Sequence, residues 1–542
     1  MSLSVCLKGI KRILIIIMMV SPIQIIAGTT NVNFRIIDTN TGETTPVMIC
    51  ITDAGGSVHL PPDGRVPDGV STTQDYFTGI DFSKDKNWIG PVRKMNGRGN
   101  NKDRSFVYEL LASIPYWQEP VMYLASGDFS IELPPGKFQI AIDHGMEYIP
   151  VTEEFTLSGD ELYIEKTITL KRWINLPERG WYSGDVHVHH PTGTKKQRKF
   201  LLQSARAVDL HVVNVLEMGH HLGTDFKQAG FGKKFRKCDD DYCLVSGQED
   251  PRGTYGHIVG LNIESIVRDT NTYDLYDLTF KGIHKQPGAL AGFAHFSWSG
   301  LGIKEGLPIY ATTLELDFIE LLQFSKMNNL GYYDYLNMGF KLTAAAGSDV
   351  PWGSNMGEVR TMVYTGKELN VDDWFAGIAR GNTYVSNGPA LFLTVDGAVP
   401  GTELNRASDD IVNIKVEARG HESIGLPVRL QLMGNKGLLK EVFVPEGQEE
   451  ISISLKMKIE ESTWIAAYVE CNNGAMAHCT PVYVVVDGKP TWSREKAPGL
   501  IQSQLDIIAT VEGNIDQEND MHERLTKAKR FYENLLDVIQ VL

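Results

Sequence analysis

Hydrophobic periodicity changes twice along this chain, and that change most constrains its fold. Residues 29–172 and 389–488 carry short alternating apolar runs, such as 32–37 in the first segment and 391–395 in the second. Alternation of this kind predicts half-buried β-strands, because successive side chains of a strand point to opposite faces. We therefore predict two β-sandwich domains, one on each side of a central domain.

The central segment, residues 173–388, has a different rhythm. Short apolar runs alternate with helix-like stretches, and each run ends near a polar residue; they are 212–216, 290–295, 319–324 and 342–347. This alternation is typical of a βα barrel, whose chemistry lies at the C-terminal ends of its strands. The last segment, residues 489–542, shows helical spacing with a break at Gly513-Asn514, which predicts a helical tail packed on the body rather than a dimerising coiled coil.

The N-terminus has the pattern of an export signal. Lys8, Lys11 and Arg12 precede the apolar run 13–20, and Ala27-Gly28 offers a cleavage point. The run is shorter than the roughly 20 residues that a membrane span needs. We therefore predict a signal peptide at residues 1–28, a periplasmic or secreted location, and no stable membrane span after cleavage.

Charge and cysteine content narrow the partners. The net charge is −15 and no run of Lys and Arg marks a nucleic-acid surface, so we expect a small-molecule or glycan-derived substrate and no nucleic acid. The pairs Cys238/Cys243 and Cys471/Cys479 could form two local disulfides in an oxidising compartment. The first spacing could also suggest zinc, but no second pair accompanies it. Cys50 is predicted to be a buried thiol. The sequence does not determine the oligomeric state.

Nine of the fourteen histidines fall between His187 and His295. At the start of this cluster, Asp185, His187 and His189 alternate with valines, so on a strand the three share one face. Two imidazoles so placed can bind one metal ion, and Asp185 could orient an imidazole through its second nitrogen. The alternative is a pair of surface or hydrogen-bonded histidines.

The segment from Trp181 to His189 resembles the opening motif of hydrolases of the PHP (polymerase and histidinol phosphatase) superfamily, in particular its carbaryl-hydrolase-like branch. Further segments match the same pattern in order: Gly247-Gln248-Glu249 with Gly256-His257-Ile258, Gly292-Phe293-Ala294-His295, Ala346-Gly347-Ser348-Asp349, and Arg380 to Pro389. The resemblance implies a multidomain protein in which a PHP-type distorted (β/α)7 barrel is flanked by the two β-sandwiches and followed by the helical tail.

The same resemblance implies a set of metal ligands. One ion would be bound by His187, His189, Glu249 and Asp349, and Glu249 would bridge to a second ion bound by two further histidines, His257 and His295. It implies one or two divalent ions, with zinc, manganese and iron all suited to histidine and carboxylate ligands. A water held between two such ions loses its proton near neutral pH and becomes the nucleophile.

Two further residues are candidate catalytic residues. They are Asp185, on the face shared with His187 and His189, and Arg360, which could stabilise an anionic transition state. An ordinary structural ion pair is the alternative for Arg360.

The sequence departs from the PHP pattern at a third metal site. Many members bind a third ion through an acid after the opening motif, a histidine in a later triplet and a histidine after the Gly-Ser-Asp aspartate. Here these positions hold the run His190 to Gly193, Glu217 and Pro351, so we expect two ions at most. The loss also weakens the case for phosphatase activity.

The predicted function is therefore that of an exported metal-dependent hydrolase of ester, carbamate or phosphoester bonds, with a slight preference for bonds other than phosphoesters. One alternative is a non-catalytic glycan-binding envelope protein with a vestigial PHP barrel. Another is a structural envelope protein whose helical tail mediates assembly.

Overall fold

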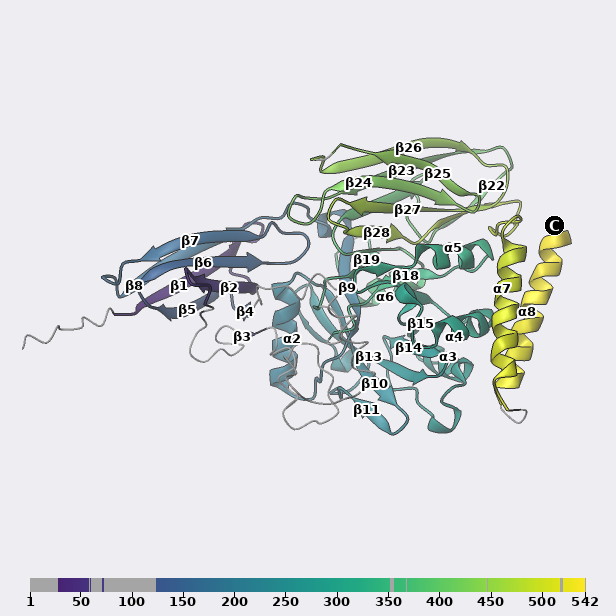
Figure 1. The fold of residues 1–542 in the computed structure, drawn as a ribbon, viewed down its shortest axis with the longest axis horizontal. Helices are drawn as coiled ribbons and strands as arrows, with labels where there is room; N and C mark the ends of the chain where they lie inside the picture. The colour runs from purple at the N-terminus through teal and green to yellow at the C-terminus, as the bar shows by residue number, and fades with distance from the viewer. Residues whose placement is uncertain are drawn as a thin grey trace, which may run out of the picture.

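The computed structural model describes residues 28–57, 59, 71–72, 123–350, 355–366, 368–445, 447–516 and 520–541. The predicted signal peptide lies outside these residues apart from Gly28. The molecule is elongated, with the N-terminal strands at one end and two long helices at the other (Figure 1). No helix in the described ranges is long and apolar enough to cross a membrane.

The N-terminal strands form two sheets that share one core. One sheet has the order β5-β1-β8 and the other the order β3-β4-β2-β6-β7. Strand β5 alternates exposed and buried residues along its length, and the core includes Val32, Phe34, Ile49 and Ile140. Apolar side chains on one face of each sheet are thereby removed from water. The strands are β1 (Thr30–Asp38), β2 (Val47–Asp53), β3 (Ser71–Thr72), β4 (Tyr123–Ala125), β5 (Asp128–Leu133), β6 (Gly136–Asp143), β7 (Val151–Leu157) and β8 (Tyr163–Leu170).

The central strands carry the predicted metal ligands. The pairs β9–β10, β10–β13, β15–β16 and β16–β18 are parallel, and all eight residues of β9 are buried. Strands covered on both faces read as continuous apolar runs, as these do in the sequence. The strands are β9 (Trp181–Val188), β10 (Val212–His220), β11 (Gly223–Asp225), β12 (Lys237–Asp239), β13 (Tyr242–Gly253), β14 (Gly256–Leu261), β15 (Leu290–Phe293), β16 (Phe318–Gln323), β17 (Lys326–Met327), β18 (Thr343–Ala346), β19 (Arg360–Tyr364) and β20 (Thr383–Ser386).

Helices connect several of these strands. The first begins at Thr194, where a capping box with Gln197 satisfies backbone N–H groups of the first turn. The helices of the central region are α2 (Lys195–Ala207), α3 (Tyr276–His284), α4 (Ile303–Tyr310), α5 (Asn329–Asn337) and α6 (Val371–Ala379).

The predicted (β/α)7 barrel is wrong. Strands β13, β14 and β15 pair antiparallel in succession, as do β9, β19 and β20, and strands hold 41% of the described residues against 23% for helices. The hydrogen-bonded circuit also leaves the central segment, because β20 pairs with β28 of the C-terminal region. The prediction failed because a buried apolar run looks the same in parallel and antiparallel strands, so periodicity does not reveal strand direction.

The C-terminal region adds further strands and the two long helices. Strands β21, β23 and β26 form a separate three-stranded sheet, while the others join the central circuit. Helices α7 and α8 lie side by side (Figure 1), and the Arg524 guanidinium ties α8 to Asp277 of α3 at 3.0 Å. The elements are β21 (Ala390–Val395), β22 (Glu403–Arg406), β23 (Ile411–Arg419), β24 (Pro427–Gly434), β25 (Gly437–Phe443), β26 (Glu450–Lys458), β27 (Thr463–Cys471), β28 (Met476–Cys479), β29 (Val482–Val486), α7 (Ala497–Gly513) and α8 (Met521–Val541).

Of the two disulfides that the sequence left open, one is present. Cys238 and Cys243 are bonded across the β12–β13 hairpin. Cys471 and Cys479 are buried thiols instead. The hairpin register separates them. The backbone N–H of Cys471 donates to the Ala475 carbonyl oxygen, while the Cys479 sulfur accepts the backbone N–H of Ala467.

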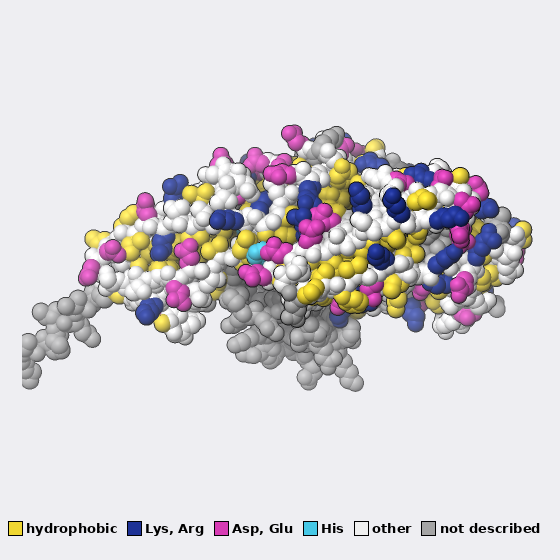
Figure 2. Space-filling model, turned by 90° about the horizontal axis from the view of Figure 1, so that it is seen from above, with side chains coloured by type: hydrophobic (Ala, Val, Ile, Leu, Met, Phe, Trp, Pro, Cys, Tyr) yellow, Lys and Arg dark blue, Asp and Glu magenta, His cyan; other side chains and the backbone are white. Residues whose placement is uncertain are grey.

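Acidic and basic side chains are interspersed with apolar ones on the face shown in Figure 2. Strands β9, β13 and β14, which carry predicted ligands, are largely buried inside the molecule.

Candidate metal centre

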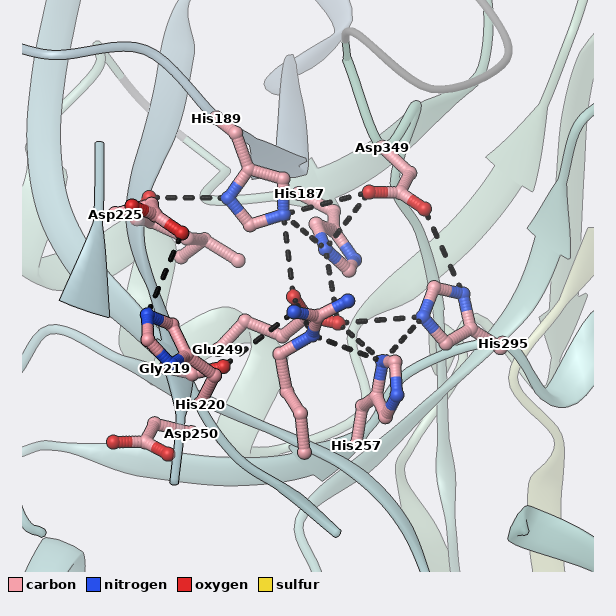
Figure 3. Close-up of polar contacts among 12 residues, drawn as sticks. His187, His189, Gly219, His220, Asp225, Glu249, Asp250, His257, His295 and Asp349 are labelled. Atoms are coloured by element: carbon pink, nitrogen blue, oxygen red, sulfur yellow. Dashed lines mark hydrogen bonds and ion pairs between the residues drawn. The ribbon is translucent and has the colours of Figure 1, made fainter. Parts of the chain in front are cut away.

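Six buried side chains converge where the central strands end (Figure 3). They form two groups of three, and within each group the ligand atoms lie within 4.8 Å of one another. We call them the first trio and the second trio. The first trio is His187, His189 and Asp349, and the second trio is Glu249, His257 and His295. The structure thus brings together all six residues that the sequence analysis assigned as ligands.

The first trio is built on β9 and on the loop after β18. His187 Nε2 lies 3.0 Å from His189 Nε2, and Asp349 Oδ1 lies 3.3 Å from the first nitrogen and 3.4 Å from the second. Alternation along β9 places both imidazoles on one face, as expected for a strand.

The second trio is built on the β13–β14 hairpin and on the second residue after β15. Glu249 Oε1 lies 2.7 Å from His257 Nδ1 and 3.3 Å from His295 Nε2. The two imidazole nitrogens are 3.0 Å apart. Each trio therefore offers nitrogen and carboxylate oxygen atoms to one point.

Glu249 also faces the first trio. Its Oε2 atom lies 3.3 Å from His189 Nε2, and its Oε1 atom lies 3.6 Å from His187 Nε2. One carboxylate is thus within reach of both groups, which is the arrangement that a bridging ligand requires.

The protonation pattern of three histidines fits a cation. The Nδ1–H of His189 donates to the Leu216 carbonyl oxygen at 3.1 Å, and the Nδ1–H of His295 donates to Gln323 Oε1 at 2.8 Å. His187 Nδ1 lies 2.6 Å from the carboxylate of Glu320. With the proton on Nδ1, each neutral ring presents the Nε2 lone pair to the cluster, as a metal ligand does.

Two unfavourable contacts point the same way. Imidazole nitrogens that face each other at 3.0 Å cannot both present lone pairs without a proton or cation between them. These buried groups could hold a metal ion, and two nitrogens each about 2.0–2.1 Å from one ion would lie roughly 3 Å apart.

Electrostatics in the cluster favour positive charge. Burial opposes ionisation of Glu249, but Arg252 and His257 outweigh it and hold the pKa of this carboxyl well below its usual value. Burial alone would lower the pKa of His187, yet the carboxylates of Glu320 and Asp349 raise it well above its ordinary value. The negative potential that favours a proton on His187 also favours a cation.

Glu320 is a supporting residue that the sequence analysis missed. It is fully buried on β16, and besides contacting His187 it accepts the His295 backbone N–H at 2.9 Å and the Gln323 side-chain amide at 3.0 Å. A single carboxylate inside the apolar run 319–324 was the available signal, because a charge is rarely buried without a partner.

Two of the candidate ligands have a strained backbone conformation. His295 and Asp349 have φ values of 63° and 55°, in the left-handed region that non-glycine residues seldom adopt. Both follow short buried strands, and such strain persists where the surroundings hold it, often at functional sites. Gly347 is required nearby, because a Cβ atom there would lie 2.4 Å from the His187 Cβ.

Asp185 does not contact an imidazole. Its Oδ1 atom accepts the backbone N–H groups of His187 and Ser348, both at 3.0 Å, and its Oδ2 atom accepts that of Gly357 at 3.2 Å. Burial raises its pKa to about 6. Asp185 therefore positions the backbone around the first trio, and Glu320 orients the imidazole in its place.

Arg360, predicted as a catalytic residue, is not brought to the ligands. Its side chain is fully buried, and its guanidinium donates to the carbonyl oxygens of Gly357, Asp209 and Val208 at 2.8, 2.8 and 2.5 Å. Three backbone acceptors use its donors, so the geometry is that of a structural residue joining β19 to the end of α2.

Two residues at the positions of the missing third site contact other groups. Glu217 accepts the Gln228 backbone N–H at 3.0 Å and pairs with Lys227 at 3.3 Å. His190 Nδ1 lies 2.7 Å from the Pro191 carbonyl oxygen. Pro351 and Trp352 lie outside the described residues.

A separate cavity of about 420 Å³ lies where the N-terminal, central and C-terminal regions meet. Met48, Glu358 and Asn473 line it from the three regions, and Arg360 and Asn387 also contribute to its wall. The described residues that line this cavity include none of the six ligands.

Comparison with known proteins does not assign a family. No protein-family model and no curated protein sequence matches this chain. Among solved structures, a superoxide reductase (neelaredoxin) from Ignicoccus hospitalis matches with 15% identity over 18% of this chain and 81% of its own length, with a TM-score of 0.15. The CARDB domain of PF1109 from Pyrococcus furiosus, in complex with di-metal ions, matches with 19% identity over 18% of this chain and 89% of its own, with a TM-score of 0.14. These likenesses are too slight to assign a function.

Proposed function

We propose that this protein is an exported metal-dependent hydrolase that cleaves an ester, carbamate or phosphoester bond in a small-molecule or glycan-derived substrate. The observation that supports this proposal is the pair of buried trios that share Glu249 as a common carboxylate. The resemblance of the ligand segments to PHP hydrolases supports the same reaction class.

The cofactor would be one or two divalent ions of zinc, manganese or iron. His187, His189 and Asp349 would hold one ion, His257 and His295 would hold the other, and Glu249 would contact both. Mixed nitrogen and oxygen ligands suit all three metals, so the donor set does not select among them. When bound, such ions polarise the bond under attack and acidify a water molecule, which serves as the nucleophile.

The protein's own residues prepare this site in two ways. The Glu320 carboxylate accepts hydrogen bonds from the Nδ1–H of His187 and from the backbone N–H of His295. It therefore holds two ligands of different trios in place. The six ligands are at most 9% exposed in their side chains, so the site excludes most water and strengthens electrostatic interactions.

Elemental analysis of the purified mature protein tests the metal. We expect one or two equivalents in the parent and loss of metal in the double variant His187→Ala/His189→Ala. The double variant His284→Ala/His421→Ala is a matched control, because it removes two partly exposed histidines outside the cluster. Absence of metal in the parent, even after reloading with zinc, manganese or iron, would falsify the proposal.

Hydrolysis is tested next with two substrates that share a leaving group. We expect p-nitrophenyl acetate to be cleaved faster than p-nitrophenyl phosphate, because the third metal position is missing. The reverse preference would point to a phosphoesterase. N-terminal sequencing of protein recovered from the periplasm or medium tests export; an intact Met1 there would contradict signal cleavage.

A further inference from the structure

A β-bulge brings a seventh polar side chain to the ligand cluster. In the β13–β14 hairpin, Glu249 pairs with Val259 and Arg252 pairs with His257, so three steps along β13 match two steps along β14. Residues three apart on a regular strand point to opposite faces, but the extra residue of a bulge redirects one of them. Arg252 Nε consequently lies 2.9 Å from Glu249 Oε2.

Buried hydrogen bonds hold this bulge in place. Asp250 is 1% exposed and accepts from the Tyr273 hydroxyl and from the Arg268 guanidinium, both at 2.6 Å. The Tyr273 oxygen in turn accepts the backbone N–H of Arg252 at 3.1 Å. The backbone of Arg252 is therefore fixed before any ligand arrives, which lowers the entropy cost of binding.

The guanidinium of Arg252 is poorly satisfied. Besides the ion pair with Glu249, it donates only weakly to His257 Nδ1 and to the Gly219 carbonyl oxygen, each at 3.4 Å. Both contacts exceed the roughly 3.2 Å limit of ordinary N–H···O hydrogen bonds, and an arginine carries five N–H donors. Most of its donors thus have no close partner among the described residues.

Arg252 differs in this from Arg360, whose three guanidinium nitrogens each donate to a backbone carbonyl oxygen. The side chain of Arg252 is 25% exposed, against 1% for Glu249 and 8% for His257. It is therefore the charged group of this cluster with the most access to solvent. Donors that are unused, preorganised and accessible are available to a ligand.

The charge of Arg252 indicates what that ligand is. Arginine does not lose its proton in proteins, so this residue places a fixed cation beside ligands for further cations. Like charges repel in a site of low dielectric unless an anion lies between them. A carboxylate or phosphoryl group offers two oxygens to the guanidinium fork.

We propose that Arg252 binds an oxyanion group of the substrate beside the second trio, so that the natural substrate is an anion. This inference rests on the proposed hydrolase function and specifies the chemical class of its substrate. Arg252 would thereby determine specificity: it recognises the group next to the bond that is cleaved.

The binding test uses full-length mature protein reloaded with manganese, with its metal content measured. Isothermal titration calorimetry measures the binding of three ligands: phenylphosphonate, 3-phenylpropionate and the neutral 3-phenylpropanamide. We expect Arg252→Met to weaken the binding of at least one anion by about 10- to 100-fold, which corresponds to the loss of a charged hydrogen bond. The affinity for the amide should not change. Arg252→Lys should restore part of the affinity. Arg206→Met is the matched control. Arg206 lies on α2, its side chain is 24% exposed, close to the value for Arg252, and it forms a 2.9 Å ion pair with Asp239 of β12.

The two anions distinguish a carboxylate substrate from a phosphoryl one, according to which depends more on Arg252. Anion binding that is equal in parent and Arg252→Met, or absent from the parent, overturns the inference. A kinetic arm separates it from the proposed function, using mono-p-nitrophenyl succinate and the neutral p-nitrophenyl butyrate. We expect Arg252→Met to raise KM for the anionic ester alone.

The outcomes of the two arms are independent. Anion binding that depends on Arg252 in a protein that cleaves neither ester would support the inference and contradict the hydrolase proposal. Cleavage of both esters with equal effects of Arg252→Met would support the hydrolase proposal and overturn the inference. Loss of metal from Arg252→Met would show that the residue acts on the ligands rather than on the substrate, and would also overturn it.

Discussion

The two trios differ in what holds their imidazoles. In the first trio, His187 and His189 are 0% exposed, and each directs its Nδ1 to a buried acceptor, the Glu320 carboxylate or the Leu216 carbonyl oxygen. These rings cannot turn without breaking a buried hydrogen bond. The first trio is therefore preorganised by its own surroundings.

The second trio is less uniformly held. His295 is fixed by Gln323, but His257 points its Nδ1 at Glu249, and burial lowers the pKa of His257 to about 4. Arg252 lies against this trio and is partly exposed. One half of the cluster is therefore held rigidly by buried hydrogen bonds, and the other half lies beside a side chain that solvent can reach. We therefore expect the first ion to bind more tightly.

Replacing Glu249 with Gln should have the largest effect, because this carboxylate faces both trios. We expect metal binding to weaken at both positions and hydrolysis to fall by more than the roughly 100-fold that loss of an outer-shell partner can cost. Metal content and kcat/KM measure the two effects. Glu217→Gln is the control, since Glu217 is buried nearby and contacts neither trio. Retention of two tightly bound ions in Glu249→Gln would refute the bridging arrangement.

Replacing His257 with Ala should affect the second trio alone. We expect one equivalent of metal to remain, because His187, His189 and Asp349 are untouched, while the second equivalent is lost. Elemental analysis after dialysis against a weak chelator gives the stoichiometry. A variant that loses both ions together would show that the two trios are not separable.

Replacing Glu320 with Gln should weaken the first ion by about 10- to 100-fold, the usual effect of losing an outer-shell partner of a histidine ligand. Glutamine keeps the size of the buried side chain but does not carry the charge that pairs with His187 Nδ1. Competition with a metal indicator measures the affinity, and circular dichroism checks the fold. An unchanged affinity would mean that Glu320 does not orient His187.

Titration with a chelator should give the smallest effect, but it measures most directly the difference in metal affinity between the two trios. We expect the second ion to leave first with little change in Tm. Removal of the first ion should then lower the Tm by a few degrees, because a ligand present at about 100 times its Kd contributes about 2.7 kcal/mol. Differential scanning calorimetry follows both steps. Loss of both ions in a single step would contradict unequal trios.

Much of the candidate site could be predicted from the sequence. The ligands lie in short local patterns, and alternation on a strand is enough to put His187 and His189 on one face. The left-handed conformations of His295 and Asp349, two and three residues after buried strands, could not be predicted, because the surrounding fold imposes them.

The supporting residues required three-dimensional information. Glu320 reaches His187 because β16 pairs with β18. The loop after β18 lies beside β9, where the backbone N–H of Asp349 donates to the His187 carbonyl oxygen. Asp185 was expected to orient an imidazole, but its carboxylate accepts the backbone N–H groups of Ser348 and Gly357 instead. The residue type alone does not show which donor a buried carboxylate will bind.

The pattern of residues along the chain accounts for the local features, which are the β-rich and helix-containing segments and the histidine face of β9, while the six candidate ligands came from the resemblance to PHP hydrolases. Strand direction, the antiparallel pairing of β13, β14 and β15, and the contacts of Arg252, Glu320 and Arg360 depend on the fold as a whole. Periodicity records which face of an element is buried. The identity of the element that covers this face depends on packing between segments far apart in the chain.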